Sequence, residues 1–405
     1  MSRSVLDRRL LFKKLQRHRP ALVKFTRDLI AIPSFSGREG PAVRRTHAEM
    51  RKAGFDAVRI DRMGNVIGRI GRGRIKILFD AHLDTVGVGD RGAWRHDPFR
   101  GKHRGGFIHG RGATDQKSAM ASIVYAGRLI KELGLGADCT FLAVGSCMEE
   151  DCEGAPLRHI IEKERIRPDF VVITEPSALR ICRGQRGRME MKVALKGRSC
   201  HASVPERGVN AISGMAAVIR EIDALNSRLR PDPFLGKGSV AVTKIESGTP
   251  SLNAVPDQCA IYLDRRLTAG ETLKGSLAEI RRLKSVRKLK AEVTVPDYEA
   301  LSWRGVRVAQ PKHFPAWVTP RRHALIRAAE KAGRLALGRP PVVGKWAFST
   351  NGVATAGRLK IPTVGFGPSD DLLAHTTTER VGVDELLKAA VFYAALPHLL
   401  ASGGS

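Results

Sequence analysis

The stretch RIKILFDAHLDTV, residues 74–86, decides the fold, because a β-rich apolar run ends there in polar side chains. A segment with helical spacing, KSAMASIVYAGRLIKELG (117–134), follows and stops at a glycine. Two more apolar runs with acidic ends come next, CTFLAVGSCMEED (139–151) and DFVVITEP (169–176). Buried strands alternating with a helix predict an α/β layer with a mostly parallel sheet flanked by helices.

The pattern changes near residue 186, where alternating strands replace buried ones. We expect helices at 210–229 and 270–286 and strands at 187–197, 239–247, 257–267 and 290–298. Two helices on one face of such strands indicate a compact α+β insert. The helix-like 323–338 and the strand-like 361–368 then resume the first pattern. We therefore predict a catalytic domain in two segments, 1–184 and 298–405, interrupted by an inserted domain at 185–297.

Composition fits a globular chain, with 405 residues, 42% hydrophobic and 27% charged. No apolar stretch is long enough to span a membrane, and the basic N-terminus lacks a secretory pattern. The six cysteines form no Cys-x-x-Cys pair, so we expect reduced thiols. These features predict a cytoplasmic location.

A formal charge of +29 raises the alternative of a nucleic-acid-binding protein. The basic residues are spread along the whole chain, however, and aromatic residues make up only 5%. In the densest cluster, RRLKSVRKLK (281–290), Leu283, Val286 and Leu289 recur every third residue. That spacing leaves the cations on a solvated helix face, so we do not expect nucleic acid as a partner.

Polar residues at the strand ends are candidates for a site, because ligands bind there in open α/β sheets. His82 and Asp84 are two apart and share a strand face, so Asp84 is placed to orient the imidazole. Asp115 stands just before a helix, where it could cap that helix or bridge two cations.

Glu149, Glu150 and Asp151 would repel one another if they were buried without a cation. Glu149 and Glu150 can share one site only where the strand ends and turns, and an exposed acidic loop is the alternative. Glu175 ends another strand, and His375 lies near the end of the sequence. Carboxylate and imidazole ligands without a thiol suit zinc, cobalt or manganese.

The order of these blocks resembles the ArgE/DapE/aminoacylase/carboxypeptidase family of two-zinc amidohydrolases and peptidases. The resemblance rests on DAHLDTV, HGRGATDQKSAMA, SCMEED, ITEP and AHTTTE. Within that family the chain is most similar to the YgeY-type hydrolases, a group linked by gene context to selenium metabolism. RGQRGRMEM, SCHASVPERGVNAI, PSLNAVPDQC, DRRLTAGET, FPAW and FSTNG carry this second likeness.

The resemblance implies a zinc-peptidase-like catalytic domain with an inserted lid and dimerisation domain. It implies that Asp115 bridges two divalent ions, zinc or alternatively cobalt or manganese. The other implied ligands are His82 and Glu175 on one ion and Glu150 and His375 on the other. Glu149 would be the general base and Asp84 the partner of His82. One departure is Lys117-Ser118, where the family usually has Lys-Gly.

In the inserted domain the resemblance implies that His201 reaches the active site of a partner subunit in a homodimer. Asn253 and Arg265 would contact the substrate. The expected reaction is hydrolysis of a peptide or N-acyl amino-acid bond in a small amide or dipeptide-like substrate, by a metal-activated water. A metal-binding family member without amidase activity is the alternative.

Overall fold

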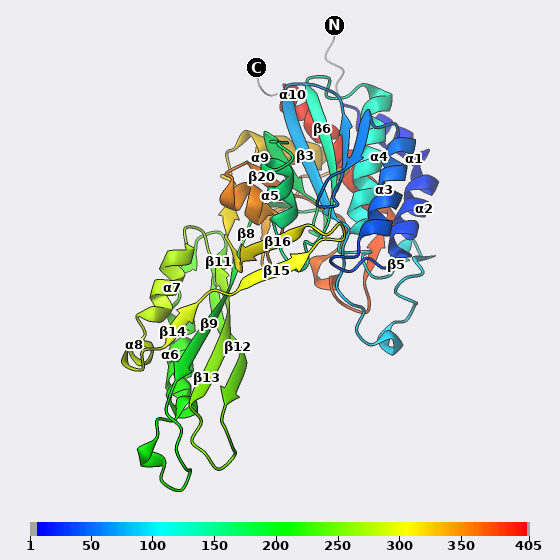
Figure 1. Cartoon of the computed structure of the whole chain (residues 1–405). Helices are drawn as coiled ribbons and strands as arrows, with labels where there is room; N and C mark the ends of the chain where they lie inside the picture. The colour runs from blue at the N-terminus through cyan, green and yellow to red at the C-terminus, as the bar shows by residue number, and fades with distance from the viewer. Residues whose placement is uncertain (1–5, 403–405) are drawn as a thin grey trace.

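The computed structural model describes residues 6–402 and divides into two lobes (Figure 1). The larger lobe is built on a nine-stranded sheet with the order β1-β2-β6-β3-β7-β20-β8-β18, and β19 also pairs with β8. Its strands are β1 (Ala57–Ile60), β2 (Val66–Ile70), β3 (Ile75–His82), β6 (Cys139–Ser146), β7 (Phe170–Ile173), β8 (Ile181–Gln185), β18 (Trp317–Val318), β19 (Val343–Trp346) and β20 (Thr363–Gly365). The centre, β6-β3-β7-β20, is parallel, as the buried apolar runs predict.

Strand alternation divides the core between the two faces of this sheet. Ile77 and Phe79 of β3 point into one hydrophobic cluster, whereas Leu78 points into another on the opposite face. The first face is covered by α1 (Arg8–Gln16), α2 (Arg19–Ile30), α3 (Gly40–Lys52), α4 (Lys117–Leu133), α9 (Ala324–Leu337) and α10 (Val383–Ser402). The second face carries α5 (Ala155–Glu162) and η3 (Val353–Arg358).

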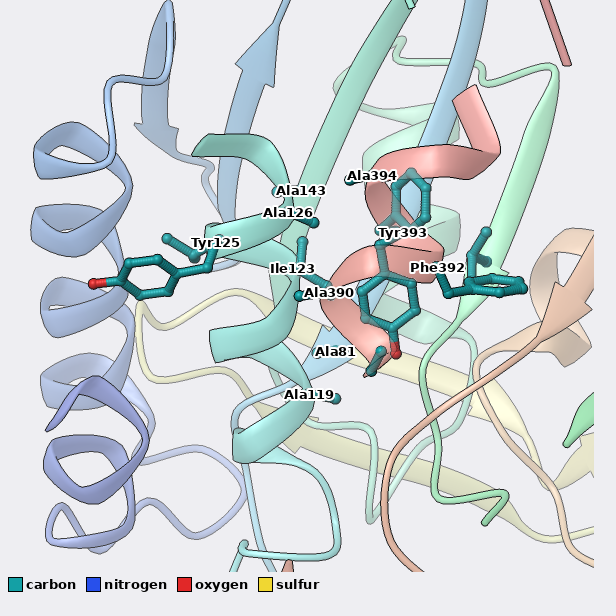
Figure 2. Close-up of a cluster of buried hydrophobic side chains, with 14 of the residues drawn as sticks. Ala81, Ala119, Ile123, Tyr125, Ala126, Ala143, Ala390, Phe392, Tyr393 and Ala394 are labelled. Atoms are coloured by element: carbon teal, nitrogen blue, oxygen red, sulfur yellow. The ribbon is translucent and has the colours of Figure 1, made fainter. Parts of the chain in front are cut away.

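Small side chains let α4 and α10 lie side by side over the sheet (Figure 2). Ala119 and Ala126 of α4 and Ala390 and Ala394 of α10 are all buried at this interface. Tyr393 is buried beside them, and its hydroxyl donates to the Phe366 carbonyl at 2.7 Å. None of the helices within residues 6–402 combines the length and apolar composition that crossing a bilayer requires.

The smaller lobe is the predicted lid, an antiparallel sheet of order β12-β13-β9-β14 with β17 also on β9. Its elements are β9 (Gly187–Lys196), β12 (Ser239–Gly248), β13 (Gln258–Leu267), β14 (Glu292–Thr294), β17 (His313–Phe314), α6 (Ala211–Arg228), α7 (Leu273–Arg281) and α8 (Lys284–Lys288). The β9 side chains are buried at every second position, and the buried ones pack with the helices. The boundaries at 185 and 297 remain predictions, and β17 lies beyond the second of them.

Two elements differ from expectation. The helix expected over 270–286 is interrupted, because α7 ends at Arg281 and the short α8 begins at Lys284. The strand expected over 290–298 divides at Val295–Pro296 into β14 and β15 (Asp297–Leu301). β15 pairs with β16 (Arg307–Pro311) in a separate two-stranded hairpin.

Smaller elements complete the fold. They are β4 (Lys102–Arg104), β5 (Phe107–His109), β21 (Arg380–Gly382), β10 (Pro231–Asp232), β11 (Gly236–Lys237), η1 (Arg91–Ala93), η2 (Pro205–Arg207) and η4 (Asp371–Leu373). All six cysteines are free thiols, and all but Cys200 are buried.

Candidate metal centre

The candidate site lies at the carboxyl ends of three adjacent parallel strands. His82 is the last residue of β3, Glu149 comes three residues after β6, and Glu175 comes two residues after β7. Because β3 pairs in parallel with both β6 and β7, these three ends meet at one edge of the sheet. The strand positions thus bring together side chains far apart in the sequence.

Asp115 lies between the two histidines and offers one oxygen to each. Its Oδ1 is 2.8 Å from His82 Nε2, and its Oδ2 is 3.2 Å from His375 Nε2. His82 Nε2 is also 3.6 Å from Glu175 Oε1 and 4.0 Å from Glu149 Oε2. On the other side, Glu150 Oε2 is 3.1 Å from His375 Nε2. The structure thus brings together all six residues predicted for the metal centre and its base.

Burial and crowding shift the pKa values of these groups. Burial, with neighbouring carboxylates, raises the pKa of Glu149 and of Glu175 well above the usual range and raises that of Glu150 less. Hydrogen bonds to Asp115 and Glu150 raise the pKa of His375 to about 10. Burial opposes the charging of His82, but Asp115 and Glu175 outweigh it and raise its pKa well above 6.5. Four carboxylates around two imidazoles leave an excess of negative charge.

Divalent cations fit this donor set. The donor atoms of His82, Glu149 and Glu175 lie within 4.8 Å of one another, as do those of His82, Asp115 and Glu150. Glu149 Oε1 is buried and has no hydrogen-bond partner among the described residues. A buried carboxylate oxygen without a donor, beside three further carboxylates, favours a cation. Imidazole with carboxylate oxygens is a typical zinc donor set.

Asp84 holds the acidic turn through its carboxylate. Its Oδ1 and Oδ2 accept hydrogen bonds from the backbone N–H groups of Glu149 and Glu150, at 3.1 and 3.0 Å. The His82 Nδ1 atom is 2.9 Å from the Asp84 backbone oxygen but 3.6 Å from its carboxylate. Asp84 therefore orients His82 through its backbone, and its side chain positions the turn, an arrangement that sequence spacing did not indicate.

The loop that presents Asp115 is held by Glu379, which sequence reasoning did not single out. Glu379 Oε1 accepts from the backbone N–H groups of Gly112, Thr114 and Asp115, each at 2.9 Å. The capping alternative for Asp115 is not what the structure shows, because Gln116 occupies the N-cap of α4. At the Lys117-Ser118 departure, the buried Lys117 amine donates to the carbonyls of Leu29 and Ile32 at 3.1 and 2.6 Å.

A cavity of about 350 Å³ lies over this centre and includes residues of the lid. Its lining is Asp115, Glu149, Glu150, Glu153, Glu175, Arg188, Arg266, Phe348, Ser349, Asp371, Ala374 and His375. The arginine predicted to contact the substrate, Arg265, is absent from this lining. Its side chain is buried in the lid and paired with Glu271 and Glu279. Because adjacent strand residues face opposite sides, Arg266 lines the cavity and Arg265 does not, and the substrate contact of Arg265 stays a prediction.

His201 and Asn253 lie together in the lid, outside that cavity lining. His201 is exposed, with Nδ1 2.7 Å from the Ser203 hydroxyl, and Ala202 N donates to the Asn253 carbonyl at 2.8 Å. Within this chain, therefore, neither residue joins the metal-centre residues.

Comparisons with known proteins agree with this geometry. Residues 78–398 match the family described as Peptidase family M20/M25/M40. The chain is 46% identical to the uncharacterized protein YgeY of Escherichia coli K12 over 96% of each chain. It is 26% identical to succinyl-diaminopimelate desuccinylase of Dinoroseobacter shibae, over 92% of this chain and 97% of that one.

Solved structures show the same fold. Aminopeptidase PepT of Bacillus cereus superposes with a TM-score of 0.73 at 20% identity, over 95% of this chain and 99% of that one. Human carnosine dipeptidase 1 gives a TM-score of 0.69 at 17% identity, over 98% and 99%. With the family match spanning most of the sequence and the acids and histidines gathered at the sheet edge, the chain belongs to the M20/M25/M40 peptidase family of metallohydrolases.

Proposed function

We propose that this metallohydrolase cleaves a peptide or N-acyl amino-acid amide bond with the help of two divalent ions. The observation that carries the proposal is the position of Asp115, which offers one oxygen toward each histidine. A carboxylate in that position can join two ions, each completed by one histidine and one glutamate. Zinc fits the donors, and cobalt or manganese could replace it.

The proposed ligand groups follow the distances. His82, Asp115 and Glu175 would hold one ion, and His375, Asp115 and Glu150 the other. When bound, the two ions would polarise the scissile carbonyl and acidify the attacking water. Asp84 and Glu379 keep the ligands in place by binding the backbone of the two loops that carry them.

Glu149 is the proposed general base. Its carboxylate is buried beside His82 and Glu175, where it can take a proton from the attacking water. Burial raises its pKa in the metal-free chain, which favours holding that proton. Its Oε1 has no partner among the described residues, so this oxygen is free for that proton. Glu149 then gives the proton to the departing amine, which leaves as a neutral group.

Arg266 is the proposed contact for a substrate carboxylate. Of the two arginines that line the cavity, Arg188 is paired with Glu153 at 2.8 Å and Glu190 at 3.0 Å. Among the residues that the structure describes, Arg266 is paired only through Nε, with Asp264 at 2.8 Å, so its terminal nitrogens are the better donors to a carboxylate. An amino-acid or dipeptide-like product carries such a carboxylate.

We further propose a homodimer in which His201 serves the partner's active site. Its exposure in the lid, away from the cavity of its own chain, supports this arrangement. The imidazole would donate to the oxyanion that forms as water adds to the carbonyl.

The test is a substrate screen of the zinc- or cobalt-loaded protein against N-acyl amino acids and dipeptides. Glu149→Gln should keep its metal and lose about 10²- to 10⁴-fold in turnover, because proton transfer contributes that much. Glu162→Gln is the matched control, because Glu162 is exposed on α5. No turnover of any substrate by a fully loaded protein, or full turnover by Glu149→Gln, would reject the proposal.

A further inference from the structure

The β15–β16 hairpin belongs to neither large sheet and runs between the two lobes (Figure 1). Its register places Tyr298 opposite Gln310 and Ala300 opposite Val308 on one face. These residues are buried or half-buried, whereas the alternate residues, such as Leu301 and Arg307, are exposed. The face of the hairpin that carries Tyr298, Ala300, Val308 and Gln310 therefore packs against another part of the protein.

That partner is the acidic turn, residues 147–154, which carries Glu149 and Glu150. Val308 is buried in a small cluster with Cys147, Met148 and Cys152 of the turn, and Tyr298, Ala300 and Trp303 pack against it. Gln310 Nε2 donates to Cys152 Sγ at 2.9 Å and to the Glu153 carbonyl at 3.3 Å. The hairpin thus supports the turn through contacts separate from the two hydrogen bonds of Asp84.

Support is needed because the turn has an unfavourable backbone. Met148, directly before Glu149, has a φ of 61°, in the left-handed region that side chains larger than glycine rarely adopt. Such a conformation persists only where surrounding contacts enforce it. Met148 is fully buried in the cluster that the hairpin covers.

At its tip, the hairpin is anchored to the catalytic lobe by Trp303. The Trp303 Nε1 atom donates to the Gly64 carbonyl at 3.1 Å. A Cβ atom at Gly64 would lie 2.1 Å from that nitrogen, so the ring is seated against bare backbone. The next residue, Asn65, accepts a hydrogen bond from the Cys147 N–H at 3.0 Å through Oδ1. Trp303 is thus connected to the turn through the cluster and through Asn65.

At its base, the hairpin is tied to the lid strand β9. The Lys312 amine is 2.6 Å from Glu190 Oε2, and Glu190 N donates to the Lys312 carbonyl at 3.0 Å. Arg188, also on β9, is paired with both Glu190 and Glu153 of the acidic turn. The same hairpin therefore contacts the lid and the turn.

We propose that the β15–β16 hairpin is a latch on the acidic turn and that Trp303 is its positioning residue. Trp303 acts through the turn: it keeps Glu149 directed at the substrate water and Glu150 directed at its ion. Because the base of the hairpin is bonded to β9, a movement of the lid would also shift Glu149 and Glu150. The expected change in kcat rests on the proposed function, whereas the expected change in the Co²⁺ spectrum does not.

The experiment compares Trp303→Ala with Trp303→Phe in the Co²⁺-loaded full chain. We expect Trp303→Ala to change the visible Co²⁺ absorption spectrum and to weaken Co²⁺ binding about 10- to 100-fold, the range for lost support of metal ligands. On a cleaved substrate, kcat should fall and KM should stay the same. Trp303→Phe, which keeps the packing, should recover most of the spectrum.

Leu301→Ala is the control, because Leu301 is in the same hairpin but its side chain is 62% exposed. If Trp303→Ala does not fold, Gln310→Met tests another contact between the hairpin and the turn, because it removes the donor to Cys152 and Glu153. An unchanged Co²⁺ spectrum and affinity in a folded Trp303→Ala or Gln310→Met protein would overturn the latch. Active Glu149→Gln would instead overturn the proposed function and leave the spectroscopic result to decide the latch.

Discussion

The two lobes differ in how many of their candidate functional residues lie together at the cavity. In the catalytic lobe, Asp115 contacts both histidines, and the remaining glutamates lie within a few ångströms of them. In the lid, His201 and Asn253 sit on the surface away from the cavity, and only Arg188 and Arg266 reach its lining. The metal centre is therefore preorganised in one lobe, whereas the role proposed for His201 requires motion of the lid or a second subunit.

The largest expected effect is in the catalytic lobe. Asp115→Ala should lose metal from both positions and reduce turnover by about 10³-fold or more, because several kcal/mol of transition-state stabilisation disappear. The metal-to-protein ratio and kcat measure this. Asp138→Asn, an exposed acid far from the centre, is the control. A full metal complement in Asp115→Ala would show that the preorganised lobe does not depend on a shared carboxylate.

His201→Ala tests the lid. We expect turnover to fall about 10²- to 10³-fold with metal content unchanged, the usual cost of one oxyanion donor. If His201 acts across a dimer, mixing inactive His201→Ala with inactive Glu149→Gln should restore about a quarter of wild-type activity, since half of the random dimers have one intact site. Lack of restoration in dimers shown to exchange subunits would assign His201 to its own chain.

Substitutions of Arg265 and Arg266 test which lid residue contacts a substrate bound between the lobes. Arg266→Ala should raise KM by about 10- to 100-fold for a carboxylate substrate, a loss of 1.5–3 kcal/mol for one charged hydrogen bond. It should have little effect on the matching amide. Arg265→Ala should instead destabilise the lid, because it leaves Glu271 and Glu279 without their buried partner. KM with each substrate and the unfolding midpoint separate the two outcomes, and a selective KM effect in Arg265→Ala would support Arg265 as the substrate contact.

Metal removal should affect the stability of the two lobes unequally. Chelation should lower the unfolding free energy by about 3–4 kcal/mol, the stabilisation from a ligand at 100 to 1,000 times its dissociation constant. Hydrogen exchange should speed up at the ends of β3, β6 and β7 and stay the same in β9 and β13. Equal acceleration in both lobes would contradict an independent metal centre.

The stability of the metal-free protein should also depend on pH. Burial raises the pKa of Glu379 to about 7 from 4.5, and burial also raises the pKa values of Glu149 and Glu175. The folded state then binds these protons more tightly than the unfolded state, so their stabilising contribution is present at low pH and is lost as pH rises through about 7. Thermal unfolding midpoints between about pH 5 and 8 should fall without metal and stay nearly level with it.

The sequence predicted those parts of the site that depend on strand ends. His82, Glu149 and Glu175 follow apolar runs, and parallel pairing brings such ends together. The motif alone does not indicate that Arg266 lines the cavity and Arg265 does not, because the side of a strand that faces a cavity depends on how the strand packs. Glu379 carries no local signal for its contact with Asp115, since 264 residues separate the two. The hairpin was missed because the break at Pro296 leaves the apolar alternation almost continuous.

The central sheet takes strands from both sides of the lid in the sequence, since β7 pairs with β20 across residues 174–362. During synthesis, the acids of β6 and β7 emerge long before His375 and before α10, which packs on α4 (Figure 2). The lid contains its own hydrophobic cluster, so it can fold on the ribosome while the first segment waits for its missing strand and helix. Hydrolytic competence should therefore be among the last properties that a nascent chain acquires.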